Sequence, residues 1–392
     1  MYFTNSRLFV KYGFMVERPF WLNRLFEGWS KRPLVWLAGV RRAGKTTLAR
    51  MLPDTVYMNC DLPSVEDRLE DPESFFRSQT PDRIIVLDEV HRLPDPSRVL
   101  KIAVDEFPAL RLLATGSSTL AATRKFRDAL TGRKVTVYLT PVLWDECPDF
   151  GVTDLDQRLI RGGLPEAILA EEKDEQFFAE WLDSFYARDV QELFGIRQRS
   201  GFLSLLRLLL RQSGGLVDIS ALSRECDMSR PTVKAHLEAL QVACAVFLLP
   251  PYHGGGRREI LKRPKAYAFD TGFVTFARGW NEIHPEDRGP LWEHLVLDTL
   301  RSSVLEERLG YWRDKSGREV DFTVSRGNEV DAVECKLHPS RFAATSLEAF
   351  RRLYPRGRNL LVCPGVQQPY ERRYGKMHVH VCSTGALPAF FR

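Results

Sequence analysis

The chain has 392 residues, of which 44% are hydrophobic and 27% charged, and its formal net charge is +5 at pH 7. This length exceeds a single hydrophobic core and predicts about two to four domains. No apolar run reaches the roughly 20 residues that a membrane-spanning helix needs. Asn5, Arg7 and Lys11 interrupt the amino-terminal apolar stretch, which argues against a secretory signal. The sequence therefore predicts a globular cytoplasmic protein without a membrane partner.

The seven cysteines are scattered along the chain and form no C-x-x-C pair. This spacing argues against a zinc site and suits a reducing cytoplasm. The basic excess permits a nucleic-acid partner but does not establish one. Its densest local run is residues 257–265 (RREILKRPK).

A phosphate-binding loop is predicted near the amino terminus. Apolar residues 34–39 (LVWLAG) lead into GVRRAGKTT at residues 39–47, and a helical pattern follows. Glycines let backbone N–H groups surround phosphates, and the helix start adds positive potential. We expect ATP here, with Lys45 at the β- and γ-phosphates and the Thr46 hydroxyl on Mg²⁺. The predicted nucleotide contacts are Gly39, Arg41, Arg42, Ala43, Gly44, Lys45, Thr46 and Thr47.

Two further apolar runs, residues 84–87 and 110–115, end in polar residues that would complete an ATPase site. Apolar strands that alternate with helical segments predict a parallel α/β sheet. Asp88 would hold Mg²⁺ through water, and Glu89 would polarise the attacking water. Thr115 and Ser117 would lie beside the γ-phosphate, unless they only cap the next helix. Arg133 is a candidate cation for the charge that develops during hydrolysis.

The middle of the chain is predicted to be helical from residue 156 to residue 240, with a break at residues 162–165 (GGLP). Ser229 is a suitable N-cap, and Pro231 falls in the first turn that follows it. In a helix-turn-helix, the side chains facing a DNA major groove would be Ser229, Arg230, Thr232, Lys234 and His236. The side chains contacting phosphates would be Arg257, Arg258, Lys262, Arg263 and Lys265. A winged helix that only packs domains together is the alternative.

Acidic residues and a lysine mark a hairpin near the carboxy terminus. Asp321 lies in the strand-like run 319–324, and Glu334 and Lys336 end the run that starts at residue 330. Alternation places Glu334 and Lys336 on one face. Asp321 and Glu334 would bind Mg²⁺, while Lys336 would position water or stabilise the charged phosphorane during phosphodiester hydrolysis. Glu293 could supply another carboxylate. Ordinary cross-strand ion pairs are the alternative.

Nearly the whole chain resembles prokaryotic ATP-binding proteins in which an AAA-type domain precedes a domain of unknown function. The matching motifs are GVRRAGKTTLAR (39–50), IIVLDEVHRLP (84–94), LLATGSSTL (112–120), LTGR (130–133), GGLPEA (162–167), FYARDVQEL (185–193), MSRPTVKAHLEAL (228–240), KRPKAYAFDTGF (262–273), YWRDKSGREVDFTV (311–324) and AVECK (332–336). Thr131 and Pro231 depart from the family pattern. The resemblance implies ATP and Mg²⁺ as cofactors, with the roles given above for Lys45, Asp88 and Glu89.

The resemblance also implies an α/β fold with four parts. These would be an AAA-like ATPase core (residues 1–145), a helical lid (146–200), a winged-helix domain (201–278) and a PD-(D/E)xK nuclease-like domain (279–392). The first hypothesis is an ATP-hydrolysing, DNA-binding protein with a Mg²⁺-dependent nuclease-like domain. The alternatives are an ATP-dependent regulator with an inert nuclease fold, and a module that holds nucleotide with little turnover. The sequence leaves open whether the chain forms a homo-oligomer.

Overall fold

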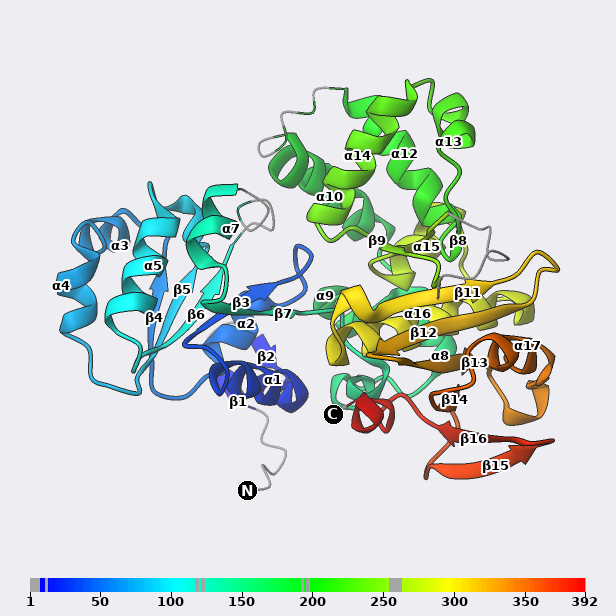
Figure 1. Ribbon diagram of the computed structural model, residues 1–392. Coiled ribbons are helices and arrows are strands. Elements are labelled where there is room, and N and C mark those ends of the chain that lie inside the picture. The colour runs from blue at the N-terminus through cyan, green and yellow to red at the C-terminus, as the bar shows by residue number, and fades with distance from the viewer. Residues whose placement is uncertain are drawn as a thin grey trace. The chain divides into compact units, whose positions relative to one another are not determined.

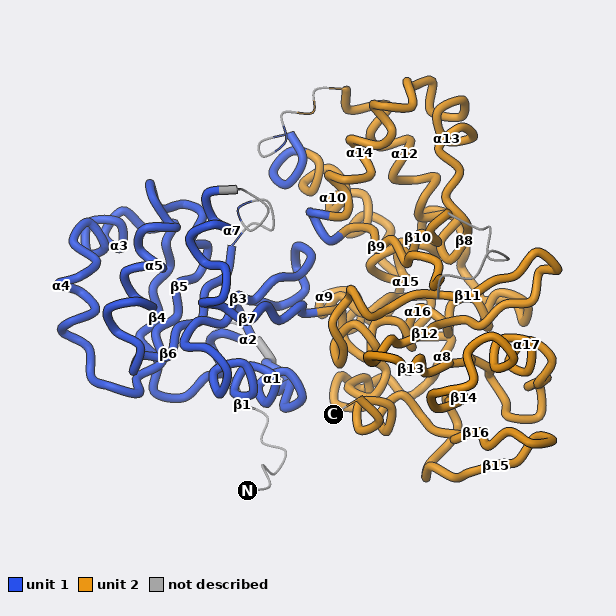
Figure 2. Tube along the Cα trace, viewed as in Figure 1, with its two compact units in different colours: residues 1–139, 187–195, 242–244 blue, residues 140–186, 196–241, 245–392 orange. Residues whose placement is uncertain are grey.

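The computed structural model describes residues 8–10, 13–116, 120, 124–191, 194, 196, 198–253 and 263–391. The chain falls into two compact units (Figure 2). Unit 1 contains residues 1–139, 187–195 and 242–244, and unit 2 contains residues 140–186, 196–241 and 245–392. The four-domain division stays a prediction.

Unit 1 is built on a five-stranded parallel sheet with the strand order β4-β5-β6-β3-β7 (Figure 1). Every residue of β3 and β5 is buried, because both faces of a parallel sheet are normally covered. The predicted parallel α/β sheet and its three predicted strands are therefore confirmed. The strands are β3 (Leu34–Ala38), β4 (Thr55–Asn59), β5 (Ile84–Asp88), β6 (Arg111–Thr115) and β7 (Lys134–Tyr138).

Among the described residues, six α-helices of unit 1 accompany this sheet, and a short hairpin, β1 (Leu8–Val10) and β2 (Gly13–Met15), precedes them. The Asp95 carboxylate caps one helix by accepting from the Arg98 N–H, and Pro96 occupies its first turn. In the core, the Trp36 and Phe126 rings meet with their centroids 4.9 Å apart. The helices are α1 (Pro19–Trp29), α2 (Lys45–Arg50), α3 (Pro63–Arg68), α4 (Pro72–Arg77), α5 (Pro96–Glu106) and α7 (Arg124–Leu130).

Unit 2 starts with helices and a small antiparallel sheet of strand order β8-β10-β9. As predicted, Ser229 caps a helix, because its hydroxyl accepts from the Thr232 N–H at 3.2 Å. The helices are α8 (Leu155–Arg161), α9 (Pro165–Leu169), α10 (Glu175–Phe185), α12 (Arg199–Arg211), α13 (Ile219–Glu225), α14 (Arg230–Val242) and α15 (Thr271–Arg278). The π-helical η3 (Tyr186–Gln191) follows α10 and belongs to unit 1 from residue 187 onward. The strands are β8 (Gly215–Leu216), β9 (Val246–Leu249) and β10 (Lys265–Ala268).

Two residues predicted to face DNA are instead buried. His236 is 5% exposed, and its ring lies 5.4 Å from the Phe202 ring. Lys265 is also 5% exposed, because its ammonium pairs with Glu319 and lies 5.3 Å from the centre of the Tyr311 ring. The prediction that these two side chains face nucleic acid was therefore wrong. Arg257, Arg258 and Lys262 lie outside the described residues.

A buried carboxylate holds the Gly162-Gly163 break against α15. The Asp270 carboxylate accepts from the Gly163 N–H at 2.6 Å and from the Gly272 N–H at 2.7 Å. A Cβ at Gly162, where φ is +80°, would overlap the Asp270 Oδ1. Arg158 closes the other side by donating to the Val142 carbonyl at 2.9 Å. The segments 162–165 (GGLP) and 269–272 (FDTG) are thus held together within unit 2 by hydrogen bonds to the Asp270 carboxylate, a contact that we call the Asp270 lock.

A six-stranded mixed sheet with the order β11-β12-β13-β14-β16-β15 ends the chain. It confirms the strand-like runs predicted at residues 319–324 and from residue 330 onward, and the helix α16 (Pro285–Ser303) precedes it. The Trp292 indole N–H on α16 donates to the Val362 carbonyl at 3.1 Å. The other elements are β11 (Leu309–Arg313), β12 (Glu319–Arg326), β13 (Glu329–Cys335), α17 (Thr345–Leu353), β14 (Asn359–Val362), β15 (Tyr370–Tyr374) and β16 (Met377–Cys382).

Among the described residues, no helix is both long enough and apolar enough to cross a membrane.

Candidate functional site

The loop between β3 and α2 has the backbone that phosphate wrapping requires. Gly39 has φ of +149° and Gly44 has φ of +95°, conformations that favour glycine. A Cβ at Gly39 would also come within 2.5 Å of the Leu139 carbonyl oxygen. Gly44 is the N-cap of α2, so the free N–H groups of that helix start at the loop. Strand, loop and helix follow one another as predicted.

Lys45 lies on the first turn of α2 and folds back over the loop. Its ammonium donates to the carbonyl oxygens of Gly39 at 2.8 Å and Val40 at 3.1 Å. Burial lowers the pKa of Lys45, and the negative charge of Glu89 partly opposes that effect. An anionic phosphate in the loop would give this ammonium a stronger partner than two carbonyls.

The other predicted loop residues fall into two groups. Ala43 is buried and packs into the unit, so only its backbone can serve a ligand. Arg42 and Thr47 are exposed, and Thr46 is half-buried. Arg42 has a φ of +61°, which is uncommon for a residue other than glycine.

Asp88 ends β5 inside a small hydrogen-bond network. The Thr115 hydroxyl, from the end of β6, donates to the Asp88 Oδ1, and the Tyr57 hydroxyl, from β4, donates to the Oδ2. Thr115 also accepts from the Glu89 N–H at 3.0 Å. Three neighbouring strands therefore fix Asp88 and the backbone of Glu89. Thr115 was predicted, whereas Tyr57 was missed because a tyrosine in a strand belongs to no nucleotide-binding pattern.

Glu89 follows the strand in a left-handed conformation with φ of +57°. Its Oε2 lies 3.3 Å from the His91 Nδ1. The hydrogen bond from His91 lowers the pKa of Glu89, although burial opposes the shift. Glu89 is consequently ionised at neutral pH and can accept a proton or orient a water molecule.

A residue from far along the chain joins this site. Asp189 on η3 belongs to unit 1, and its Oδ2 lies 3.5 Å from the Arg41 Nη1 in the phosphate-binding loop. Burial raises the pKa of Asp189, while Arg41 lowers it. Asp189 was not predicted as a site residue, because more than a hundred residues separate it from the loop in sequence.

One predicted residue of the nucleotide site is engaged elsewhere, and another lies outside the described residues. The Arg133 guanidinium pairs with Asp105 at 2.6 Å, so its charge is already engaged on the surface of the unit. Ser117 lies outside the described residues.

The predicted carboxy-terminal residues converge at the ends of β12 and β13. The Lys336 ammonium donates to the Asp321 Oδ2 at 3.3 Å, the Glu334 Oε2 at 3.1 Å and the Cys335 carbonyl at 3.0 Å. The Cys335 N–H donates to the Asp321 Oδ2 at 2.7 Å. Asp321 and Glu334 are 7% and 5% exposed, which makes the site largely dry.

Crowded carboxylates perturb one another at this site. Burial raises the pKa of Glu334 to about 8, and the charge on Asp321 adds to the effect. Burial and Asp321 likewise raise the pKa of Glu293, on α16, to about 8. Burial alone would lower the pKa of Lys336, but Asp321 and Glu334 outweigh it and raise the value. These groups form one electrostatic cluster.

The donors of this cluster match the oxygen ligands that Mg²⁺ prefers. Two carboxylates and the Cys335 carbonyl surround the ammonium, and the Glu334 Oε1 is buried without a hydrogen-bond partner. Within the described part of the chain, however, no three acidic, histidine or cysteine side chains are arranged to hold a metal ion. A cation would therefore use Asp321, Glu334 and the carbonyl, with Lys336 displaced.

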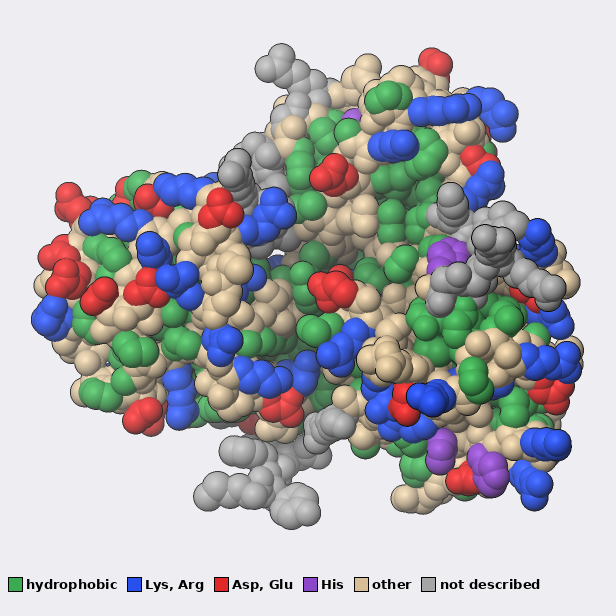
Figure 3. Space-filling view, in the orientation of Figure 1, with side chains coloured by type: hydrophobic (Ala, Val, Ile, Leu, Met, Phe, Trp, Pro, Cys, Tyr) green, Lys and Arg blue, Asp and Glu red, His purple; other side chains and the backbone are tan. Residues whose placement is uncertain are grey.

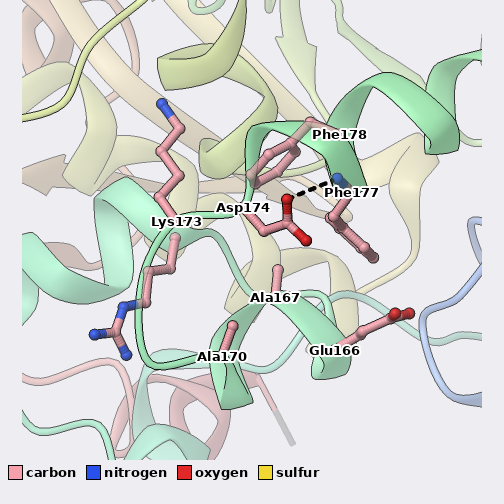
Figure 4. A pocket seen from close by; sticks show the side chains of 8 residues that line it. Glu166, Ala167, Ala170, Lys173, Asp174, Phe177 and Phe178 are labelled. Carbon is pink, nitrogen blue, oxygen red and sulfur yellow. Dashed lines mark hydrogen bonds between the residues drawn. The ribbon is translucent and has the colours of Figure 1, made fainter.

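Two kinds of pocket lie elsewhere. A pocket of about 70 Å³ beside α9 and α10 is lined by Glu166, Lys173, Asp174 and neighbouring residues (Figure 4). Ligand sites usually measure about 300–1,000 Å³, so this pocket is too small for a nucleotide. Two grooves of about 380 and 400 Å³ run beside α5, and no phosphate-loop residue lines them.

Three segments of the chain match known protein families. Residues 31–147 match a family model described as an AAA domain. This match and the parallel sheet with its glycine loop support an AAA-type P-loop ATPase fold for this part of the chain. Residues 152–284 match the domain of unknown function DUF8612, and residues 288–383 match the domain of unknown function DUF4143.

Relatives and solved structures add two observations. Uncharacterized proteins of Mycobacterium bovis and Mycobacterium tuberculosis are each 29% identical over 337 residues, covering 82% of this chain and 74% of each relative. The RuvB Holliday junction branch migration motor of Thermotoga maritima is 17% identical, with a TM-score of 0.30, covering 60% of this chain and 90% of RuvB. Cdc6p of Pyrobaculum aerophilum is 13% identical, with a TM-score of 0.28, covering 66% of this chain and 92% of Cdc6p. Both scores are below 0.5, so the fold assignment depends on the sheet, the loop and the family match.

Proposed function

We propose that the AAA-type domain binds ATP with Mg²⁺ and hydrolyses it. The shared network of Asp88, Thr115 and Glu89 carries this proposal, because it aims two acidic groups at the end of the sheet beside the loop. Backbone N–H groups from Gly39 to Gly44 and the Lys45 ammonium would bind the phosphates. Thr46 and Asp88 would hold the metal ion, which neutralises the phosphate charge when bound.

The chain's own groups account for the chemical step. Glu89 is ionised and restrained by His91 and by its backbone bond to Thr115, so it can orient a water molecule in line with the γ-phosphate. Arg41, in the phosphate-binding loop, forms an ion pair with Asp189. A bound phosphate would compete with Asp189 for the Arg41 guanidinium.

We also propose that the carboxy-terminal cluster is a Mg²⁺-dependent nuclease site. The position of the Lys336 ammonium among two carboxylates and a carbonyl carries this proposal, since the same oxygens suit a hard cation. A bound Mg²⁺ would polarise the phosphoryl oxygen and its attacking water. Lys336, once displaced by the metal ion, would stay within reach of the negative charge that develops on the phosphate. Glu334 would bind the metal ion together with Asp321.

DNA is the proposed substrate because α14 carries exposed cations that could contact phosphates. Arg230 and Lys234 are exposed one turn apart on α14, and so they share one helix face. Arg263 is partly neutralised by Asp218 at 2.9 Å and contributes less. We also propose that α14 is the recognition helix of a winged-helix domain.

The deciding experiment incubates the purified protein with single- and double-stranded DNA, with Mg²⁺ or Mn²⁺, in the presence and absence of ATP. We expect metal-dependent cleavage by the wild type and none by Lys336→Ala, while ATP turnover is equal in both. Equal cleavage by both proteins would show that the nuclease site is wrong. Likewise, unchanged ATP turnover in Glu89→Gln would remove the assigned role of Glu89.

An ATP-dependent regulator with an inert nuclease fold is the second candidate. The existing ion pairs of Lys336 favour it, because they satisfy both carboxylates without a metal. For this candidate, wild-type protein turns over ATP but never cleaves DNA with either metal, and Lys336→Ala lowers stability without changing any nucleic-acid product.

A further inference from the structure

Positive charge is concentrated at the carboxy-terminal end of the chain. Residues 337–391 contain eight lysine or arginine residues and two acidic residues, Glu348 and Glu371. The formal net charge of the whole chain is only +5, so the part before this segment carries no positive excess. The segment forms α17 and the strands β14, β15 and β16.

Two of the eight cations have structural roles. The Arg358 guanidinium pairs with the buried Asp331 at 2.8 Å, and the Arg351 guanidinium donates to several carbonyl oxygens, including that of Val330 at 2.9 Å. The remaining six are exposed, and within the described part of the chain none of them forms an ion pair with a carboxylate. We call these six the basic hairpin surface: Arg341, Arg352, Arg356, Arg372, Arg373 and Lys376.

Packing brings Arg341 and Arg352 close to the cations of the β15–β16 hairpin. The Tyr374 ring of β15 packs against the Phe342 ring beside Arg341, with centroids 4.9 Å apart, and Arg372 lies over Tyr374 at 5.1 Å. At the hairpin turn, a Cβ on Gly375 would lie 4.0 Å from the Oε1 of Glu348, which is one helical turn before Arg352. At the lower right of Figure 3, Lys and Arg side chains lie over the β15–β16 region beside histidine and acidic side chains.

The sheet register links this surface to the cluster of Asp321, Glu334 and Lys336. Glu334 pairs with Leu361, Leu361 with Val381, and Val381 with Tyr370. The exposed edge strand β15 therefore starts level with Glu334, three strands away, at roughly 14 Å for strands about 4.8 Å apart. From Tyr370, which is 44% exposed, the strand leads through Arg372 and Arg373 to the turn at Lys376.

We propose that the basic hairpin surface binds the phosphate backbone of nucleic acid and leads it to the Asp321, Glu334 and Lys336 cluster. Cations without carboxylate partners need no ion pair to be broken before they meet phosphates, and each contact releases counterions. Tyr370 offers an exposed ring on which a base can stack. The guiding role depends on the proposed nuclease function, whereas binding does not. The register with a phosphodiester-cleaving cluster favours nucleic acid over an acidic protein or an anionic membrane.

Binding is tested by fluorescence anisotropy of labelled single- and double-stranded DNA in EDTA, so that cleavage cannot contribute. The variant combines Arg372→Gln, Arg373→Gln and Lys376→Gln. Its matched control removes the same charge from exposed sites of unit 1 through Lys31→Gln, Arg83→Gln and Lys101→Gln.

We expect the hairpin variant to bind duplex at least about tenfold more weakly than the control. Its slope of log affinity against log salt, measured between about 50 and 200 mM, should fall by about 2.7, or about 0.9 for each lost phosphate contact. Equal affinity and slope for the two variants would overturn the proposal. So would complete loss of binding in Arg230→Gln/Lys234→Gln with no loss in the hairpin variant.

Charges on an edge strand also prevent strand pairing between molecules, so the hairpin variant could aggregate. Arg372→Lys/Arg373→Lys keeps the charge and the edge protected, and we expect it to retain the wild-type salt slope. Binding of wild type to phosphatidylserine vesicles but not to DNA would also overturn the proposal. If wild type binds DNA through this surface yet never cleaves it, the nuclease proposal fails and the binding surface stands.

Discussion

Replacing Thr115 by valine would test how the AAA-type domain positions its acidic residues. Valine has nearly the shape of threonine, so the main change is the loss of one hydroxyl in the buried end of β6. That hydroxyl donates to the Asp88 Oδ1 and accepts from the Glu89 N–H at 3.0 Å. Asp88 would keep its bond from Tyr57, and the Glu89 backbone would lose its anchor.

The magnitude follows from these two hydrogen bonds. A bond to a charged group contributes about 1.5–3 kcal/mol net and a neutral bond about 0.5–1.5 kcal/mol, so the stability of unit 1 should fall by about 2–4 kcal/mol. The hydrogen bond between the Glu89 N–H and Thr115 orients Glu89 for the chemical step. If its loss raises the transition-state free energy by about 1.4–2.8 kcal/mol, kcat falls by about 10- to 100-fold.

Steady-state ATPase assays and calorimetric ATP binding measure the two effects separately. We expect kcat to fall while the Kd for ATP stays within about twofold, because Thr115 does not lie in the phosphate loop. Thr115→Ser keeps the hydroxyl and should retain most of the turnover. A wild-type kcat in Thr115→Val, in a protein that still binds ATP, would refute the positioning role.

Three further outcomes follow from described contacts. In urea unfolding followed by tryptophan fluorescence, Gly162→Ala should lower the free energy of unfolding by at least about 3 kcal/mol, because it combines left-handed strain with overlap on the Asp270 carboxylate. At Gly279 a Cβ meets no neighbouring atom, so Gly279→Ala should lower the free energy of unfolding by only about 1–2 kcal/mol. Burial raises the pKa of Asp298 to about 7, so the folded state holds a proton that the unfolded state releases above about pH 4, and stability falls between pH 4 and 7 by up to about 1.4 kcal/mol per pH unit. Asp298→Asn should remove that part of the pH dependence of unfolding. Asp189→Asn should tighten ATP binding about two- to tenfold in calorimetry, because it removes a negative charge that competes for Arg41.

Each outcome has a clear contrary result. Equal losses for the two alanine variants would show that the Asp270 lock does not constrain the glycine pair. An unchanged pH profile in Asp298→Asn would show that the carboxyl group does not titrate in the folded state over this range. Weaker ATP binding in Asp189→Asn would mean that the carboxylate orients Arg41 for phosphate instead of competing with it.

Local patterns were sufficient to predict the phosphate loop, its strand and helix, and the acidic end of β5. Each of these depends on residues that are adjacent in sequence, so spacing carries the geometry. The strands β12 and β13 were predictable for the same reason, and alternation correctly placed Glu334 and Lys336 together. The later strands β14, β15 and β16 were not predicted.

Contacts between distant segments were not predictable from these patterns. Tyr57 and Asp189 reach the nucleotide site from β4 and η3, where neither belongs to a spaced motif. His236 was predicted to face DNA from the helix-turn-helix pattern, and Lys265 from the basic run at residues 257–265. Glu319 and Phe202, which bury them, are many residues away. Pairing of this kind depends on tertiary packing, which periodicity alone does not encode.

Residues 187–195 belong to unit 1, although unit 2 supplies the residues on both sides of them. Unit 1 is consequently not one continuous segment of the chain, and it could not be transplanted as a single piece. A truncation after residue 139 would keep the loop and all five strands but remove Asp189, and with it the partner of Arg41. An intact unit 1 therefore needs the amino-terminal segment together with residues 187–195 and 242–244.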